Sequence, residues 1–158
     1  GFGCLGLWMA RHLIENGARH LAFLSRSNAP RDEYRPEWEA LQQSSVTIEA
    51  IPCDVTDAGS VSAAMEQLID GNSKQRPPVK GVFHLAGALA DGSLQKQTRE
   101  MLQLVFDVKV KGAHNLHEAL QGLDVELDHF TVFSSITGLF GSLGQSNYAA
   151  ANSCLDAF

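Results

Sequence analysis

The segment GFGCLGLWMARHLIENGARHLAFLSR (residues 1–26) contains a glycine-rich turn, an amphipathic stretch and a short apolar run, in that order. Apolar residues recur every four positions in the amphipathic stretch and a glycine follows them, which predicts a helix over residues 3–16. The apolar run at residues 20–24 predicts a buried strand. A glycine-rich turn that opens a helix exposes backbone N–H groups that can bind a pyrophosphate, although such a turn can also be only a helix start.

Further along the chain, β-like apolar runs alternate with helix-spaced ones, which is typical of a parallel sheet covered by helices on both faces. Further strands are predicted over residues 46–51, 79–85 and 130–134. Helices are predicted over residues 36–43, 56–69 and 98–120 and from near Asn147, with a loop over residues 71–78. We therefore expect an α/β protein with a Rossmann-like, doubly wound parallel sheet, in one domain over residues 1–158.

Both ends of the chain are expected to be truncated. The chain opens on the glycine-rich turn, whose usual context includes a preceding strand, and it stops inside a helix without a cap. The expected fold then lacks its first strand and its C-terminal part. Residues 1–158 expressed alone are expected to be poorly stable and to bind a nucleotide weakly, because part of the sheet would be unpaired.

The composition excludes several classes of function. The net charge is −6 and no block of Lys or Arg occurs, which argues against nucleic acids or anionic membranes as partners. No apolar run approaches the roughly 18–20 residues that cross a bilayer, and no charged segment followed by an apolar stretch and small residues resembles a signal peptide, so a cytoplasmic location is expected.

Neither the cysteines nor the histidines suggest a metal site. Cys4, Cys53 and Cys154 form no Cys-x-x-Cys pair, which argues against a disulfide framework and against zinc. His114 and His117 have helical spacing but lack a third ligand nearby. We therefore expect no bound metal.

Small or polar residues follow three of the predicted strands, where ligands of doubly wound sheets bind. Ser25 and Arg26 stand where a cation would accommodate the 2′-phosphate of NADP, so NADPH is favoured, with a solvated arginine as the alternative. Asp54 could face an adenine ring or could cap the following helix. Ala86 and Gly87 could let a nicotinamide ribose lie close.

A serine pair and a tyrosine form the sharpest candidate site. Ser134 and Ser135 end a predicted strand, and Tyr148 and Asn152, four residues apart, share one face of the last helix. A serine at the end of the adjacent strand can reach the same point in space.

A tyrosine that protonates a carbonyl oxygen near neutral pH must lose roughly 3 units from a reference pKa of about 10. A nearby cation is the usual means of lowering it. Lys109 and Lys111, on the long predicted helix, are the only lysines after Lys96, so one of them is expected to supply that cation.

Taken together, these blocks closely resemble the ketoreductase domain of polyketide synthases and animal-type fatty acid synthases, a branch of the short-chain dehydrogenase/reductases. The resemblance runs from end to end of the chain. Its blocks are GFGCLG at 1–6, LSR at 24–26, CDVTD at 53–57, VFHLAG at 82–87, KVKGA at 109–113, FSS at 133–135 and GQSNYAAAN at 144–152.

Within the wider superfamily the tyrosine is followed by Lys at the fourth position, whereas here that residue is Asn152. In the synthase ketoreductases the lysine comes from the earlier helix, which implies that Lys109 is the partner of Tyr148. The resemblance implies that Tyr148 protonates the developing alkoxide and that Ser135 hydrogen-bonds the same oxygen. It also implies that Lys109 holds the ribose and keeps the tyrosine acidic, and that Asn152 orders Lys109 or a relay water.

The implied reaction is NADPH-dependent reduction of the β-keto group of a 3-oxoacyl thioester to a 3-hydroxyacyl thioester. The implied partners are an acyl carrier protein, which presents the substrate on phosphopantetheine, and other domains of the same synthase. The implied coenzyme-binding residues are Gly1, Gly3, Leu5, Gly6, Ser25, Arg26, Asp54, Val55, Ala86, Gly87, Lys109 and Tyr148.

The resemblance also bears on stereochemistry. B-type ketoreductases, which form the D-configured 3-hydroxyl, carry Leu-Asp-Asp where this chain has Leu89-Ala90-Asp91. A-type domains carry a Trp shortly before the tyrosine, and no Trp follows Trp38 here. The resemblance therefore favours a B-type domain in which Leu89, Asp91 and Gln145 contact the substrate, with a turn-capping carboxylate as the other interpretation of Asp91.

Two other functions compete with this one. The first is a free-standing short-chain alcohol dehydrogenase for a small carbonyl compound, which the Asn at the fourth position after Tyr148 disfavours. The second is a catalytically silent domain that only packs against its neighbours. A silent domain has no physical need to retain Ser135, Lys109, Tyr148 and Asn152 together.

Overall fold

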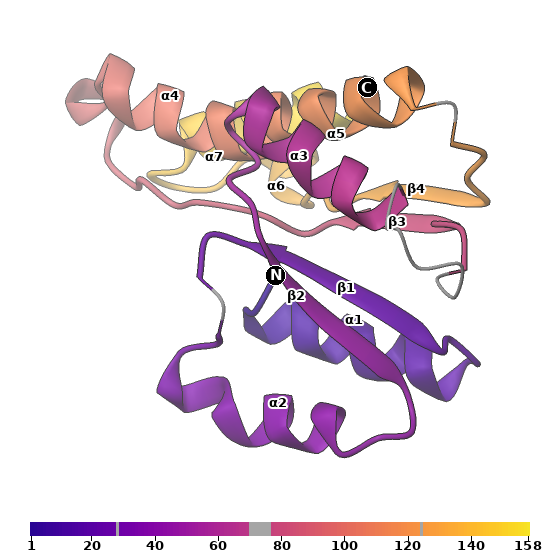
Figure 1. Cartoon of the computed structure of the whole chain (residues 1–158). Coiled ribbons are helices and arrows are strands. Elements are labelled where there is room, and N and C mark those ends of the chain that lie inside the picture. The colour runs from indigo at the N-terminus through magenta and orange to yellow at the C-terminus, as the bar shows by residue number, and fades with distance from the viewer. Residues whose placement is uncertain (28, 70–76, 124) are drawn as a thin grey trace. The chain divides into compact units, whose positions relative to one another are not determined.

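The computed structural model describes residues 1–27, 29–69, 77–123 and 125–158 (Figure 1). These residues form two compact units, of which the first contains Gly1–Asp54 and the second contains Val55–Ile69 and Pro78–Phe158. Residues 71–76 of the loop predicted over residues 71–78 lie outside the described residues.

The first unit is built from two parallel strands and two α-helices. Its elements are α1 (Cys4–Glu15), β1 (His20–Ser25), the 3₁₀ helix η1 (Asp32–Tyr34), α2 (Arg35–Gln42) and β2 (Thr47–Pro52). β1 pairs in parallel with β2 along its whole length. The helix predicted over residues 3–16 is confirmed, with the two outermost residues serving as its caps. The turn of η1 was not predicted because three residues carry no periodic signal.

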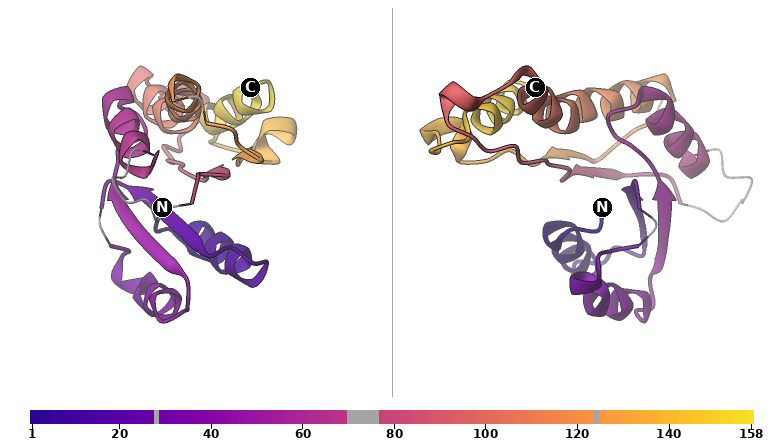
Figure 2. Two further views of the ribbon diagram at one scale, coloured as in Figure 1. Left: turned by 45° about the vertical axis from the view of Figure 1, so that its right-hand side comes forward. Right: turned by 90° about the vertical axis from the view of Figure 1, so that its left-hand side faces the viewer.

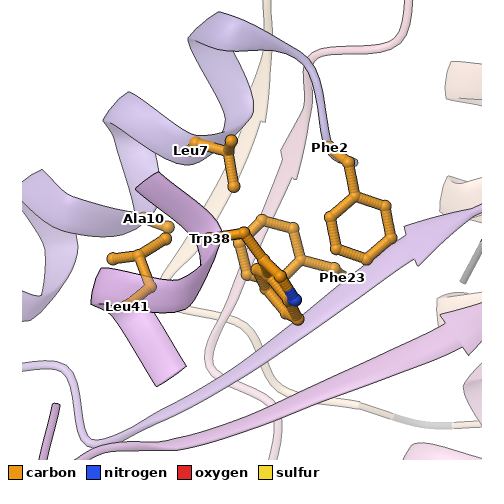
Figure 3. Close-up of a cluster of buried hydrophobic side chains, with 6 residues drawn as sticks. All are labelled: Phe2, Leu7, Ala10, Phe23, Trp38 and Leu41. Carbon is orange, nitrogen blue, oxygen red and sulfur yellow. The ribbon is translucent and has the colours of Figure 1, made fainter. Parts of the chain in front are cut away.

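An aromatic cluster holds the helices of this unit against β1 (Figure 3). The Phe2 and Phe23 rings stack with centroids 5.2 Å apart, and Trp38 meets both edge-on at 4.9 and 5.2 Å. Such offset and edge-on pairs each contribute about 0.5–1.5 kcal/mol beyond the area they bury. The buried members of the cluster are Phe2, Leu7, Ala10, Phe23, Trp38 and Leu41. Because the cluster draws on both helices and on β1, both helices pack on one face of the strand pair.

The second unit contains the remaining elements. They are α3 (Ala58–Ile69), β3 (Gly81–His84), η2 (Leu94–Lys96), α4 (Arg99–Phe106), η3 (Asp107–Lys111), α5 (Gly112–Gly122), β4 (His129–Val132), α6 (Thr137–Phe140) and α7 (Ser146–Asp156). β3 pairs in parallel with β4. α3 packs against α5, and α7 packs against α4 and α6. The parallel strand pairs and their covering helices confirm the predicted α/β class.

The helix predicted over residues 98–120 differs from the observed one in an informative way. α4, η3 and α5 follow one another as one helical rod (Figure 2), but η3 is a five-residue π turn. Thr98 caps the start of the rod, where its side chain accepts a hydrogen bond from the Met101 N–H. A π turn shifts every later residue around the helix axis, and π turns are frequent at functional sites.

Several strand and loop boundaries also differ from the prediction. β3 and β4 are shorter than the predicted strands, so residues 79–80, 85 and 133–134 lie outside the ladders. The short helix α6 lies between the strand predicted over residues 130–134 and the helix predicted from near Asn147, where no element was predicted, because four residues are too few to show an apolar period. No helix among the described residues is both long enough and apolar enough to span a membrane.

Candidate active site

Lys109 lies in the π turn η3 and is only 3% exposed. Its ammonium donates a hydrogen bond to the Phe133 carbonyl oxygen, at 2.9 Å, just beyond β4. Burial lowers the pKa of Lys109, because desolvation disfavours the charged form. Lys111, two residues on, is exposed. Of the two lysines that the sequence offered, the structure therefore turns only Lys109 inward.

Tyr148 and Asn152 lie on successive turns of α7, as their spacing predicted. The Lys109 Nζ stands 5.2 Å from the centroid of the Tyr148 ring, within the range of a cation–π contact. The Asn152 side-chain N–H donates to the Tyr148 carbonyl oxygen at 2.7 Å. Asn152 Oδ1 is buried and has no hydrogen-bond partner among the described residues, so it is available to accept one.

The two serines have different partners. The Ser134 hydroxyl donates to the Asn152 carbonyl oxygen at 3.2 Å, which connects the segment after β4 to α7. The Ser135 hydroxyl oxygen instead accepts a hydrogen bond from the Thr137 N–H at the start of α6, at 3.2 Å. α6 lies directly on α7, where the Ser153 hydroxyl donates to the Gly138 carbonyl oxygen at 2.9 Å. Ser135 thus keeps its own hydrogen free to donate.

The predicted stereocontrol residues lie on two loops that are joined by hydrogen bonds. The Gln145 amide donates to the Asp91 carboxylate at 3.0 Å, and the Gly92 N–H donates to the Gly144 carbonyl oxygen at 2.8 Å. Leu89 is exposed. Since the second loop leads directly into α7, the first loop is fixed relative to the start of the helix that carries Tyr148.

Asn147 is a site residue that the sequence analysis missed. It is almost fully buried, and its side-chain N–H donates to the Ala90 carbonyl oxygen at 2.8 Å and to the Met101 carbonyl oxygen at 3.3 Å. Its side-chain oxygen accepts from the Tyr148 N–H at 2.8 Å. The available signal in the sequence was an asparagine directly before the tyrosine, because an amide that is buried in a first helical turn needs hydrogen-bond partners.

In the first unit, the glycine-rich turn meets the end of β1. Gly3 caps α1 without a side chain, and no acidic residue occupies the first turn of the helix. A Cβ on Gly6 would overlap the Gly1 carbonyl oxygen, and a Cβ on Gly1 would lie 2.7 Å from Ser25 Cβ, so the turn requires both glycines. Leu5 is exposed. The N–H groups and the positive end of α1 are therefore open to an anion.

The other predicted coenzyme residues follow strands. Arg26, after β1, is exposed and has no ion-pair partner within the described part of the chain. Asp54 ends the first unit and is half-buried. The Asp57 carboxylate accepts from the Ser60 N–H at 3.1 Å and so caps α3.

In the second unit, three further predicted residues lie beside strands or helices. Val55 is held by its carbonyl oxygen, which accepts from the Asn115 side chain at 2.7 Å. Ala86 and Gly87 follow β3, and a Cβ on Gly87 would meet no atom within 4 Å. Packing inside the protein therefore does not require glycine at position 87. The predicted coenzyme residues are divided between the two units, whereas all four predicted catalytic residues belong to the second.

Comparisons with known proteins show to which family the chain belongs. A family model described as KR domain matches residues 1–158. The phenolphthiocerol synthesis polyketide synthase type I Pks15/1 of Mycobacterium marinum is 41% identical over 156 residues, which cover 98% of this chain and 7% of that protein.

Solved structures give the same result. The crystal structure of a ketoreductase domain from the bacillaene assembly line matches with a TM-score of 0.87 at 32% identity, covering 99% of this chain and 36% of that one. A structure of A-type ketoreductases from a modular polyketide synthase matches with a TM-score of 0.84 at 35% identity, covering 99% and 32%. These matches confirm the Rossmann-like fold, and the chain belongs to the KR domain family, the ketoreductases of polyketide synthases within the short-chain dehydrogenase/reductase superfamily.

Proposed function

We propose that this chain uses NADPH to reduce the β-keto group of a 3-oxoacyl thioester carried by an acyl carrier protein. The observation that carries the proposal is the buried Lys109 ammonium 5.2 Å from the Tyr148 ring, with Asn152 bonded one turn further along the same helix. A cation beside a phenol favours the phenolate that remains after the proton has left. Membership of the KR family supports the reaction class, and the synthase relatives support a carrier-bound substrate and neighbouring synthase domains as partners.

Each catalytic residue has a defined role in the proposed reaction. When bound, NADPH supplies the hydride that the carbonyl carbon receives. Tyr148 gives its hydroxyl proton to the carbonyl oxygen, which becomes the 3-hydroxyl of the product. The Ser135 hydroxyl donates its own hydrogen to the same oxygen, while its oxygen accepts from the Thr137 N–H. Lys109 stabilises the tyrosinate and binds the ribose, and Asn152 Oδ1 accepts from the Lys109 ammonium or from a relay water.

The residues proposed to bind the coenzyme fit the chemistry of NADPH. The open start of α1 suits a pyrophosphate, and the exposed Arg26 guanidinium beside Ser25 suits a 2′-phosphate. The remaining contacts are proposed for Leu5, Asp54, Val55, Ala86 and Gly87.

The chain is further proposed to be a B-type domain, which forms the D-configured 3-hydroxyl. The Asp91 carboxylate is oriented by Gln145, at 3.0 Å, three residues before Tyr148. This bond supports a role for Leu89, Asp91 and Gln145 in directing the substrate toward one face of the nicotinamide.

The test is NADPH oxidation by the full-length protein that contains this chain, with a 3-oxoacyl N-acetylcysteamine thioester as substrate. We expect turnover, and we expect chiral analysis to find the D-3-hydroxyacyl product. The L product would contradict only the B-type assignment. Absence of turnover on every 3-oxoacyl thioester by a folded protein that binds NADPH would overturn the proposal, in favour of another carbonyl substrate or a silent domain.

Replacing Arg26 by Ala should weaken NADPH use without affecting NADH use. A charge-assisted hydrogen bond contributes about 1.5–3 kcal/mol, so kcat/KM for NADPH should fall roughly 10- to 150-fold while kcat/KM for NADH is unchanged. The matched control is Arg19→Ala, which removes the same charge from an exposed position just before β1, at its opposite end. Equal losses with both coenzymes, or equal losses in both variants, would exclude a phosphate contact of Arg26.

A further inference from the structure

His84, at the end of β3, is a buried histidine that the proposed reaction does not use. Its Nε2 lies 3.0 Å from the carbonyl oxygen of Lys109. A carbonyl oxygen can only accept, so the proton of His84 is on Nε2 and this nitrogen is the donor. Burial lowers the pKa of His84, which favours the neutral ring with a single N–H.

The carbonyl that His84 contacts belongs to the π turn. Backbone N–H groups at the end of η3 donate to the carbonyl oxygens of Asp107 and Lys109. A carbonyl oxygen has two lone pairs, so the His84 bond adds a lateral restraint to the bond along the helix. Lys109 is thus held at its backbone by His84 and at its ammonium by the Phe133 carbonyl oxygen.

Gly112, the first residue of α5, has no side chain and so leaves room for the His84 ring. A Cβ on Gly112 would lie 3.1 Å from His84 Cε1 and 3.1 Å from Val55 Cγ2, both tighter than ordinary contacts. The φ of Gly112 is −59°, an ordinary helical value, so its backbone does not require glycine. Val55 is fixed in turn by its bond to the Asn115 side chain. The His84 ring therefore fits closely between α5 and the start of the segment that leads to α3.

We propose that His84 is a positioning residue whose Nε2–H fixes the backbone of Lys109 in the π turn and so sets the ammonium against the Tyr148 ring. This inference rests on the proposed role of Lys109 in the reduction. It assigns no chemical step to His84, whose effect on the rate is exerted entirely through Lys109.

Three substitutions in the full-length protein distinguish the effect of the His84 hydrogen bond from the effect of the fit of its ring. His84→Leu removes the N–H, and we expect kcat to fall about 10- to 100-fold, since small misplacements of catalytic groups have effects of this size. His84→Gln retains an N–H donor at a similar reach and should restore kcat to within about threefold of the wild type. Gly112→Ala keeps the histidine and is favoured by helix propensity, but its methyl group displaces the ring, so kcat should also fall.

A double-mutant cycle with Lys109→Met tests whether His84 affects kcat only through Lys109. We expect His84→Leu to slow the Lys109→Met protein no further. Full additivity, or failure of Gln to restore kcat in a protein with a normal melting temperature, would overturn the positioning role. Wild-type activity of Lys109→Met would instead refute the proposed function itself. If His84→Leu does not fold, Gly112→Ala takes its place in the cycle.

Discussion

Replacing Tyr148 by Phe should lower kcat for thioester reduction about 10²- to 10⁴-fold, the range that a positioned general acid contributes. The substitution removes one oxygen and leaves the ring that faces the Lys109 ammonium at 5.2 Å. The Asn152 side chain bonds to the backbone carbonyl of residue 148 and not to its phenol, so α7 keeps that contact. NADPH affinity, measured by fluorescence titration, should therefore change far less than kcat.

The chain offers one matched control for this substitution. Tyr34 is the only other tyrosine, and it packs against the aromatic cluster of the first unit. Tyr34→Phe removes the same atom from a residue to which no catalytic role is assigned, so its kcat should equal that of the wild type. If Tyr148→Phe retained more than a tenth of the wild-type kcat, another group would have to deliver the proton.

The features that follow a regular period were predictable from the sequence. α1 has the predicted extent because apolar residues at every fourth position and a following Gly17 act locally. The shared face of Tyr148 and Asn152 follows from their spacing of four and needs only that α7 forms. The choice between Lys109 and Lys111 was not local, and spacing alone left it open.

The π turn determines which of the two lysines points inward, and it cannot be recognised from the spacing of apolar residues. The extra residue in η3 changes the direction of every side chain after it, so a straight-helix interpretation of residues 98–120 cannot say which lysine points inward. The same limit applies to Asn147 and His84. Both side chains donate hydrogen bonds to backbone carbonyl oxygens on other elements, and the apolar pattern does not indicate which carbonyls those are.

Lys109→Met should have the second large effect, lowering kcat about 10²- to 10³-fold, in the range seen when one electrostatic group is lost from an active site. The variant loses the cation beside the Tyr148 ring and the proposed ribose contact, so NADPH affinity should also fall, roughly tenfold or more. Lys111→Met is the matched control in the same π turn, because it removes the same charge from an exposed side chain. Its kcat and NADPH affinity should stay at wild-type values.

The same substitution should increase stability at neutral pH, although it leaves the Phe133 carbonyl oxygen without its donor. Burial lowers the pKa of Lys109 in the folded protein below its value of about 10.4 in the unfolded chain. Between these two pKa values the unfolded state binds more protons, so the wild type gains stability as pH rises through that window, and below it the desolvation penalty applies in full. In urea unfolding from pH 7 to 10.5, Lys109→Met should therefore have a higher free energy of unfolding than the wild type. This difference should be largest at pH 7 and smaller at high pH. If this difference in the free energy of unfolding stayed constant or grew with pH, burial of the Lys109 ammonium would not be its cause. The conclusion that the buried cation lowers the stability of the wild type would then be wrong.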